Sequence, residues 1–552
     1  MVNFNSTAAS SAGAPSIAWP RGYVLGGSSV LNFLVWDRAA KVEYNAWEEL
    51  GNSGWNWNNM YKYMKKAEKF TAPSAANAKK LDISPVASDY GSSGPVQVSY
   101  PNYVSQQVQK WIPALQSLGI SKNEQPLAGN NVGASVQPSD INPYNSTRSS
   151  SADAYFVPAS SRKNLKVLVS ALATKVNLSA SGSLQKATGV TFTSGGKTYT
   201  AKACEKVILS GGTVNTPALL ELSGIGSKDV LTKAGITQIV DNANVGENMQ
   251  DHVYSSAAYE LVAGTQTLDS LRNNATFAAE QQALYKANKA SILDETVPAI
   301  GYLSLSQLVG QSNATKLISD AKAYVKTQSS KPYYSTLTKQ LSFLTDDATT
   351  VSQMEVIGID GYFSGAAAPA ANSTYVTFLA AQQHLFSRGT IHVTSNKATD
   401  HPIIQPNYFT APYDLDVLTA GTQYLRKIAA SSPYSTNFIT KEYVPGNVDV
   451  REYTRKTFTT EYHPVGTASM LPKSKGGVVD SKLRVYGTTN VHVVDASVIP
   501  LHIVSGIYLK RSNCERSADF IFSAFPLIRA HTFKPPSTAL LKQQPISSKE
   551  SP

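Results

Sequence analysis

Residues 19–57 read WPRGYVLGGSSVLNFLVWDRAAKVEYNAWEELGNSGWNW and form the most informative stretch of the chain. A double glycine, Gly26-Gly27, is followed by two serines and, a little later, by Asn32. Glycine lets a backbone approach a ligand closely, and the hydroxyls and the amide supply hydrogen bonds at that approach. A GGSS cluster taken alone is more often a plain turn, so its flanking residues decide between a turn and a ligand-binding loop.

These flanking residues carry a family resemblance. Arg21-Gly22 precedes the double glycine, and an aromatic-rich segment from Tyr44 to Trp57 follows it. The stretch resembles the first signature of the glucose–methanol–choline (GMC) oxidoreductases. Within that family, its residues look most like those of the fungal aryl-alcohol oxidase branch. These are flavin enzymes that oxidise alcohols. The resemblance implies that FAD is bound by Gly26, Gly27, Ser28, Asn32 and Val35.

Composition narrows the function classes. The chain has 552 residues, 42% of them hydrophobic, and a net charge of +11. This length suffices for two or more domain-sized units. Lysines and arginines are scattered, which favours a generally basic surface over a nucleic-acid site. Because the sequence has no apolar run of membrane-spanning length, no C-x-x-C or H-E-x-x-H spacing, and only Cys204 and Cys514, we predict no nucleic-acid partner, no membrane span and no metal site.

A second block, KVILSGGTVNTPALLELSGIG, covers residues 206–226. It predicts a buried strand, a glycine turn and a helix start, where free backbone N–H groups suit an anion; an ordinary βα turn fits the same pattern. The block resembles the second GMC signature, and NVGENMQDH (244–252) resembles the segment that follows it in the family. The resemblance implies that Gly211 and Val176 lie against FAD.

A third block, HPVGTASM at 463–470, leads into a strand that ends at Asp495-Ala496. A lone histidine is usually a surface or structural residue, but this loop resembles the active-site loop of the family, and His463 matches its catalytic histidine. A neutral imidazole suits a base that takes the hydroxyl proton of an alcohol. Asp495 and Ala496 match positions that contact the flavin in relatives.

The resemblance fails in two places. The second active-site histidine of this branch falls on Ser505 or Gly506 here, and the nearby His502 matches a separate position. A dinucleotide-binding βαβ unit with G-x-G-x-x-G takes about 30 residues, but eighteen residues precede Trp19 and the fingerprint is absent from the chain. We therefore expect an N-terminally truncated form that lacks the dinucleotide-binding unit.

The expected fold is α/β: an FAD/NAD(P)-binding domain of the GMC type, N-terminally truncated, with an α+β substrate domain built on an antiparallel sheet. Two segments, LKVLVSAL (165–172) and 189–202, are predicted to be strands. Gln383 and His384 are candidates to line the substrate pocket, but a placement that faces solvent is the expectation. The predicted boundaries are 1–255 for the first part of the FAD domain, 256–455 for the substrate domain, 456–530 for the C-terminal part of the FAD domain and 531–552 for a disordered tail.

Two functions follow from these expectations. The first is FAD-dependent oxidation of a primary alcohol, with aromatic and allylic alcohols as candidate classes, by hydride transfer to flavin N5 with His463 as base and O₂ or a quinone as electron acceptor. The alternative is a catalytically inactive, truncated relative that cannot hold FAD, kept as a binding or scaffold protein or as a decaying gene product. The N-terminus lacks the pattern of a signal peptide, although N-x-S/T acceptors such as Asn145 permit secretion of a longer form.

Overall fold

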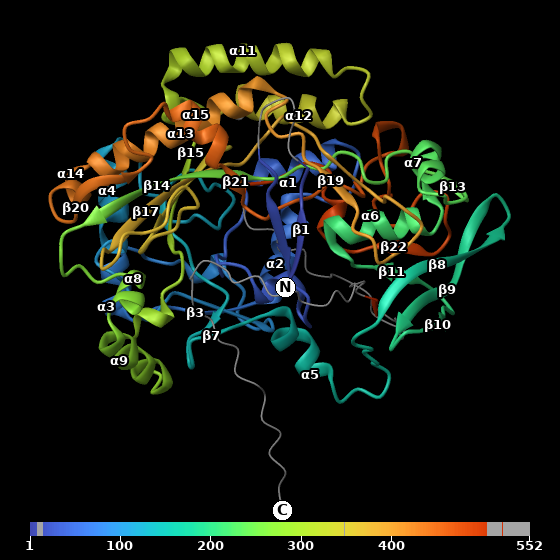
Figure 1. Cartoon of the computed structure of the whole chain (residues 1–552), viewed down its shortest axis with the longest axis horizontal. Helices are drawn as coiled ribbons and strands as arrows, with labels where there is room; N and C mark the ends of the chain where they lie inside the picture. The colour runs from blue at the N-terminus through green and yellow to red at the C-terminus, as the bar shows by residue number, and fades with distance from the viewer. Residues whose placement is uncertain (8–14, 347, 505–520, 523–552) are drawn as a thin grey trace, which may run out of the picture.

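A seven-stranded antiparallel sheet dominates the computed structural model, which describes residues 1–7, 15–346, 348–504 and 521–522. Its strand order is β20-β14-β17-β16-β15-β5, with β21 paired to one end of β14. The strands are β5 (Gly133–Val136), β14 (Val253–Leu261), β15 (Ala299–Leu303), β16 (Met354–Ile359), β17 (Tyr375–Gln382), β20 (Ile439–Val444) and β21 (Thr459–Thr460). Segments far apart in the chain therefore meet in one sheet (Figure 1).

Side chains alternate between the two faces of this sheet. In β16, Met354 and Val356 join the main hydrophobic core, whereas Glu355 and Ile357 point to the opposite face. In β17, Phe378 lies in the main core. This alternation is the two-residue period of an extended strand. Both strands are buried along their whole length.

Helices cover the face that carries the main core. The longest, α13 (Pro412–Ala430), packs on β17 and β14, and α11 (Gln311–Thr327), α12 (Tyr334–Thr345) and α15 (Val450–Thr457) lie around it (Figure 1). Gly421 lets α13 approach the sheet, since a Cβ there would lie 2.6 Å from Met354 Cε. The central strands thus gain a helical layer on one side, which leaves the other side for a ligand.

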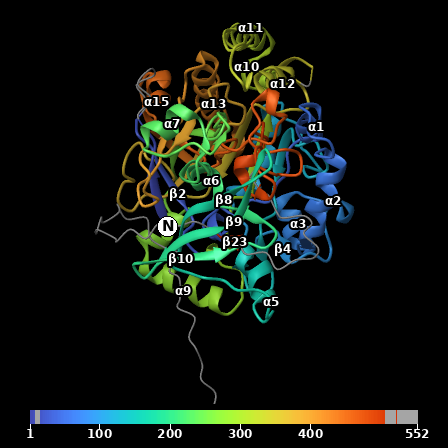
Figure 2. The ribbon, with the colours of Figure 1, turned by 90° about the vertical axis from the view of Figure 1, so that its right-hand side faces the viewer.

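A small parallel sheet lies beside the large one. It has the order β22-β11-β23, from β11 (Val207–Leu209), β22 (Val491–Val493) and β23 (Ile521–Phe522). Helix α6 (Gly212–Leu222) starts directly after β11. A three-stranded antiparallel sheet of β8 (Leu172–Ser181), β9 (Leu184–Ser194) and β10 (Lys197–Lys202) packs next to it and faces the viewer in Figure 2.

The remaining elements are short. Two-stranded sheets are formed by β1 (Val2–Asn5) with β2 (Ala18–Arg21), β3 (Glu68–Thr71) with β4 (Val96–Ser99), β6 (Ile141–Asn142) with β7 (Thr147–Arg148), β12 (Ile225–Gly226) with β13 (Val240–Asp241), and β18 (Thr390–His392) with β19 (Ile403–Gln405). The other helices are α1 (Lys41–Glu49), α2 (Trp57–Ala67), α3 (Ala75–Leu81), α4 (Trp111–Ser117), α5 (Val157–Ala159), α7 (Lys228–Lys233), α8 (Leu268–Asn273), α9 (Ala275–Lys286), α10 (Leu305–Val309) and α14 (Ser432–Ser435). Among the described helices, none combines the length and the apolar character needed to cross a membrane.

One local expectation about the strands was wrong. Residues 165–171 form no strand; Val167, Leu168 and Val169 are exposed, and the strand begins at Leu172. An apolar run becomes a strand only where a neighbour accepts its backbone hydrogen bonds, and β8 pairs with β9 from Leu172 onward. The expected disordered tail at 531–552 lies outside the described residues, and the domain boundaries stay predictions.

Candidate active site

An open cavity lies on the face of the large sheet opposite α13. Its space, mouth included, amounts to about 1270 Å³. Three parts of the chain form most of its walls: β2 with the loop after it, the faces of β14, β16 and β17 that are turned away from α13, and the loop after β21. The lining residues are Met1, Pro20, Arg21, Ser28, Leu31, Asn32, Phe33, Val35, Asp37, Tyr254, Val297, Glu355, Ile357, Ile359, Phe363, Leu379, Glu461, Tyr462 and His463.

The double-glycine loop forms one edge of this cavity. Gly26 has φ +95° and Gly27 has φ +57°, a backbone that residues with a Cβ adopt at a cost. The Gly26 carbonyl accepts hydrogen bonds from the hydroxyls of Ser29 (2.7 Å) and Ser151 (3.0 Å). Gly22 packs so closely that a Cβ there would lie 2.1 Å from the Gly27 oxygen. The loop is therefore held in one conformation, with Ser28 at the cavity.

Asn32 and Val35 continue the same wall. The Asn32 Oδ1 atom accepts a hydrogen bond from Arg148, which orients the amide. Val35 forms an antiparallel bridge with Ser139, three residues after the end of β5. Three predicted FAD-binding residues, Ser28, Asn32 and Val35, thus line one cavity together with His463.

His463 stands on the loop that follows β21. Its backbone N–H donates to Asp251 Oδ1 at 3.1 Å, and its side chain is 26% exposed at the cavity. Its Nδ1 lies 3.2 Å from His252 Nδ1 and 3.7 Å from Glu461 Oε2. The Nε2 atom has no hydrogen-bond partner among the described residues. Burial, helped by the positive charge of Arg21, lowers the pKa of His463 to about 4, so its imidazole is neutral near pH 7.

Buried carboxyl groups lie behind His463. Gln383 Nε2 donates to Glu355 Oε2 at 2.9 Å and to Glu461 Oε2 at 3.3 Å, which holds the two acids close to each other. Burial raises the pKa of Glu461 to about 8, with the charge of Asp37 adding to the rise. The pKa of Glu355 is raised too, by burial and by Glu461. This acidic cluster can exchange protons near neutral pH.

The expectation that Gln383 and His384 face solvent was wrong. Gln383 is fully buried between the two acids, and His384 is 1% exposed, with its ring between Ser352 O and Glu43 Oε1, each at 3.1 Å. The reason is that β17, which directly precedes Gln383, is a central strand that is buried along its whole length. Glu355, Glu461 and His252 were not singled out from the sequence, because lone acids and a lone histidine carry no motif.

The second group of predicted FAD-binding residues lies at the parallel sheet. Gly211 follows β11 and Asp495 follows β22, so both stand outside the carboxyl ends of neighbouring parallel strands, where open α/β sheets bind ligands. Asp495 Oδ2 accepts from the Gly212 N–H at 2.9 Å, and Thr216 Oγ1 accepts from the Gly211 N–H at 3.0 Å. Ala496 is the first residue of the short helix that Asp495 caps.

Val176 lies elsewhere. It is fully buried in β8, and its N–H donates at 2.8 Å to Ser223 Oγ, at the far end of α6 from Gly211. A hydrogen bond links the glycine loop after β11 to the loop that carries His463. Thr213 Oγ1 donates to the Pro464 carbonyl, next to His463, at 2.7 Å. The structure thus brings Gly211, Asp495 and Ala496 together, and it connects them to the cavity loop.

The expected place of the second histidine, Ser505 or Gly506, lies outside the described residues. His502 is described, and both of its ring nitrogens are engaged. Nε2 donates to the His463 carbonyl at 2.8 Å, and Nδ1 accepts from the Ile503 N–H at 3.0 Å. His502 is also 3% exposed, and its ring stacks on that of His252 with 3.6 Å between the ring centres. It therefore positions the loop and offers no nitrogen to the cavity.

The residues present fit a bound flavin. A Cβ at Gly27 or Gly212 would meet no heavy atom within 4 Å, so the backbone at both loops faces open space. The cavity between Ser28 and His463 is large enough for a ring system, and its walls are mostly apolar, as small-molecule sites are.

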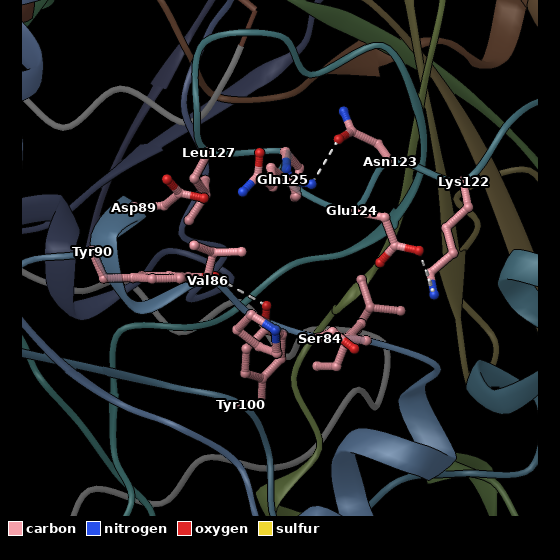
Figure 3. Close-up of a pocket in the computed structure, with 14 residues that line it drawn as sticks. Ser84, Val86, Asp89, Tyr90, Tyr100, Lys122, Asn123, Glu124, Gln125 and Leu127 are labelled. Carbon is pink, nitrogen blue, oxygen red and sulfur yellow. Dashed lines mark hydrogen bonds and ion pairs between the residues drawn. The ribbon is translucent and has the colours of Figure 1, made fainter.

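Another hollow, of about 350 Å³, lies near Tyr90 and Tyr100 (Figure 3). Its Lys122 is already paired with Asp82 and Glu124, each at 3.0 Å, which leaves it little to recognise a ligand with.

Family models and a curated protein that match this chain are described as GMC oxidoreductases. Two family models described as GMC oxidoreductase match residues 2–254 and 386–508. The GMC oxidoreductase family protein Mala s 12 of Malassezia sympodialis is 36% identical over 516 residues, which are 89% of this chain and 78% of that protein. A dehydrogenase of Armillaria gallica is 30% identical over 505 residues, with the same shares.

Solved structures of oxidoreductases are also similar to this chain. An FAD-dependent oxidoreductase from Chaetomium thermophilum has 29% identity and a TM-score of 0.82, and a fungal aryl-alcohol oxidase has 26% identity and a TM-score of 0.78. Each match covers 91% of this chain and 86% of the other. The N-terminal family match begins at residue 2. The expected truncation, and with it the inactive truncated relative, therefore finds no support.

Proposed function

This chain belongs to the GMC oxidoreductase family and is an FAD-dependent oxidoreductase; from that premise, we propose that it oxidises a primary alcohol to the aldehyde. The observation that carries the proposal is the placement of His463. Its Nδ1 is turned to His252 and Glu461, and its unpartnered Nε2 belongs to a ring that lines the cavity. A base in this position is what removal of a hydroxyl proton requires.

Two groups of residues would hold FAD. Gly26, Gly27, Ser28, Asn32 and Val35 would hold it at the cavity, and Gly211, Asp495 and Ala496 would hold it beside the parallel sheet. A contact of FAD with Val176 stays a prediction, since Val176 is fully buried at the far end of α6. When bound, FAD supplies the hydride acceptor, flavin N5. The Asp495 carboxylate, which accepts the Gly212 N–H at 2.9 Å, would hold the second glycine loop in position for it.

His463 is proposed to take the hydroxyl proton at Nε2. Its lowered pKa keeps the ring neutral, and a neutral ring with its proton on Nδ1 has a free electron pair on Nε2. His252 Nδ1 and Glu461 Oε2 are the two acceptors near that Nδ1 proton. They position the ring, and their acceptor atoms stabilise the imidazolium that forms.

The cavity favours an aromatic or allylic alcohol. Phe33 and Phe363 meet edge to face at 5.5 Å between ring centres, and Tyr254 stacks near Phe363 at 6.3 Å. Such rings pack well against a flat substrate. We propose O₂ or a quinone as the electron acceptor, in line with an aryl-alcohol oxidase and dehydrogenases among the similar proteins.

The test is alcohol turnover by the flavin-loaded protein. Benzylic and allylic alcohols would be screened with O₂ and with a quinone, for the unaltered chain, for His463→Ala and for His401→Ala, a histidine near Phe4 and away from the cavity. We expect turnover that His463→Ala abolishes and His401→Ala keeps. Equal turnover by the two variants would refute the role of His463.

A further inference from the structure

Three potential metal ligands converge at the cavity. The Nδ1 atoms of His252 and His463 are 3.2 Å apart, and Glu461 Oε2 lies 3.5 Å from the first and 3.7 Å from the second. Two imidazoles and one carboxylate form a set that suits zinc and similar divalent transition metals. The prediction of no metal site rested on local motifs, and these ligands come from two distant segments.

The sheet itself brings the ligands together. His252 directly precedes β14, and Glu461 directly follows β21, which pairs with β14 through Val253 and Thr460. The Glu461 N–H donates to the His252 carbonyl at 2.9 Å, and His463 follows two residues later. Backbone pairing thus fixes two of the ligands opposite each other, and no side chain has to move far to place the third.

The spacing matches a coordination sphere. Ligand atoms bound to zinc at about 2.0–2.1 Å in a tetrahedral arrangement lie roughly 3.4 Å from one another. The three observed separations, 3.2, 3.5 and 3.7 Å, bracket that value. One position would remain open toward the cavity, where His463 and Glu461 are 26% and 14% exposed, so an ion can enter from that side.

Charge at the site also favours a cation. Glu355 and Asp37 line the same cavity as Glu461, so three acidic side chains surround one space. Such a gathering of carboxyl oxygens favours a divalent ion bound at Glu461. Arg21 is the opposing positive group in the cavity, and it is turned to the Tyr462 carbonyl at 3.1 Å.

We propose that His252, Glu461 and His463 bind a divalent transition metal of the zinc type, and that this metal blocks the proposed base. A metal on Nδ1 of a neutral imidazole leaves the ring proton on Nε2. That nitrogen can then donate but cannot accept the hydroxyl proton of a substrate. The inhibitory half rests on the proposed function; the metal site does not.

Metal binding is tested directly on the flavin-loaded protein. After treatment with a chelator, Co²⁺ would be titrated and its absorption followed at wavelengths beyond the oxidised flavin bands, with Zn²⁺ titrated by calorimetry. We expect one equivalent bound. His252→Phe, which keeps a ring against His502, and Glu461→Gln should each weaken binding by more than the roughly 10- to 100-fold typical for loss of an outer-shell partner. His401→Ala should bind as the unaltered chain does.

The outcomes separate the two claims. Binding of no metal by the unaltered chain, or binding by both ligand variants at unchanged affinity, would overturn the site. If the variants lose their flavin, X-ray absorption on the cobalt-loaded unaltered chain decides, since it must show two imidazoles and a carboxylate oxygen. Metal binding without any alcohol turnover would uphold the site and refute the proposed function alone. With turnover present, Zn²⁺ should inhibit in proportion to occupancy and a chelator should restore the rate.

Discussion

Replacement of Gly22 by alanine tests the packing of the cavity loop. A Cβ at Gly22 would lie 2.1 Å from the Gly27 carbonyl oxygen and 2.6 Å from the Ser28 nitrogen. Ordinary contact begins at 3.4 Å, so the double-glycine loop would have to move by more than 1 Å to admit one methyl group. Both neighbours are backbone atoms, which leaves no side chain to rotate away.

Two effects follow from that displacement. Overpacking of this kind costs about 1–3 kcal/mol of stability. A displacement of about 1 Å in a positioning loop costs on the order of 100-fold in rate. We therefore expect Gly22→Ala to lower the midpoint of chemical unfolding and the turnover rate. Because the double-glycine loop is also proposed to hold FAD, the flavin content of the purified protein should fall as well.

The matched control is Gly365→Ala. Gly365 is exposed, and a Cβ there would meet no heavy atom within 4 Å, so the same chemical change should leave stability and flavin content unaltered. Absorption spectra give the flavin-to-protein ratio, and denaturant titration gives the stability. If Gly22→Ala matched Gly365→Ala in both measurements, the close packing of Gly22 on Gly27 would be refuted.

Three further changes probe the site and its surroundings. His463→Ala should lower kcat by about 10²- to 10⁴-fold, the worth of a general base, with the flavin spectrum unchanged. Gln383→Leu removes the amide that donates to Glu355 and Glu461; we expect a loss of about 1–3 kcal/mol per buried partner in denaturant titration, and equal stability would contradict the arrangement. Burial lowers the pKa of His392, but its two carboxylate partners outweigh burial and raise it to about 9. A raised pKa stabilises the fold below pH 6.5, an effect lost as pH rises through 9 and worth about 3 kcal/mol. His392→Gln should abolish that pH dependence.

Much of the fold was predictable from local patterns. The strand, turn and helix at 206–224 correspond to β11 and α6, because an apolar run followed by two glycines and a helix entry is a local signal, and distant β22 supplies the pairing that the strand requires. The segment LKVLVSAL shows the limit of such reasoning. Its apolar residues are typical of a strand, but no neighbour pairs with residues 165–171, and that fact is not contained in the segment itself.

The candidate site divides in the same way. His463, Ser28, Asn32 and Val35 were predicted from two separate sequence blocks, and they meet in one cavity. Glu461 and His252 could not be predicted, because their importance lies in their distance from His463 and from each other. Isolated acids and histidines are usually solvated or structural residues, so no local pattern selects these two.

The sequence by itself determined the family, the cofactor and the residues that carry a motif, since glycine turns and the loop before a helix need only their neighbours in the chain. The tertiary structure alone decided the surroundings of His463. Pairing of β14 with β21 brings His252, Glu461 and His463 together. Burial lowers the pKa of His463 and raises that of Glu461. The physical reason is that desolvation and through-space charge depend on which distant segments lie within a few ångströms, and those distances exist only once the sheet has formed.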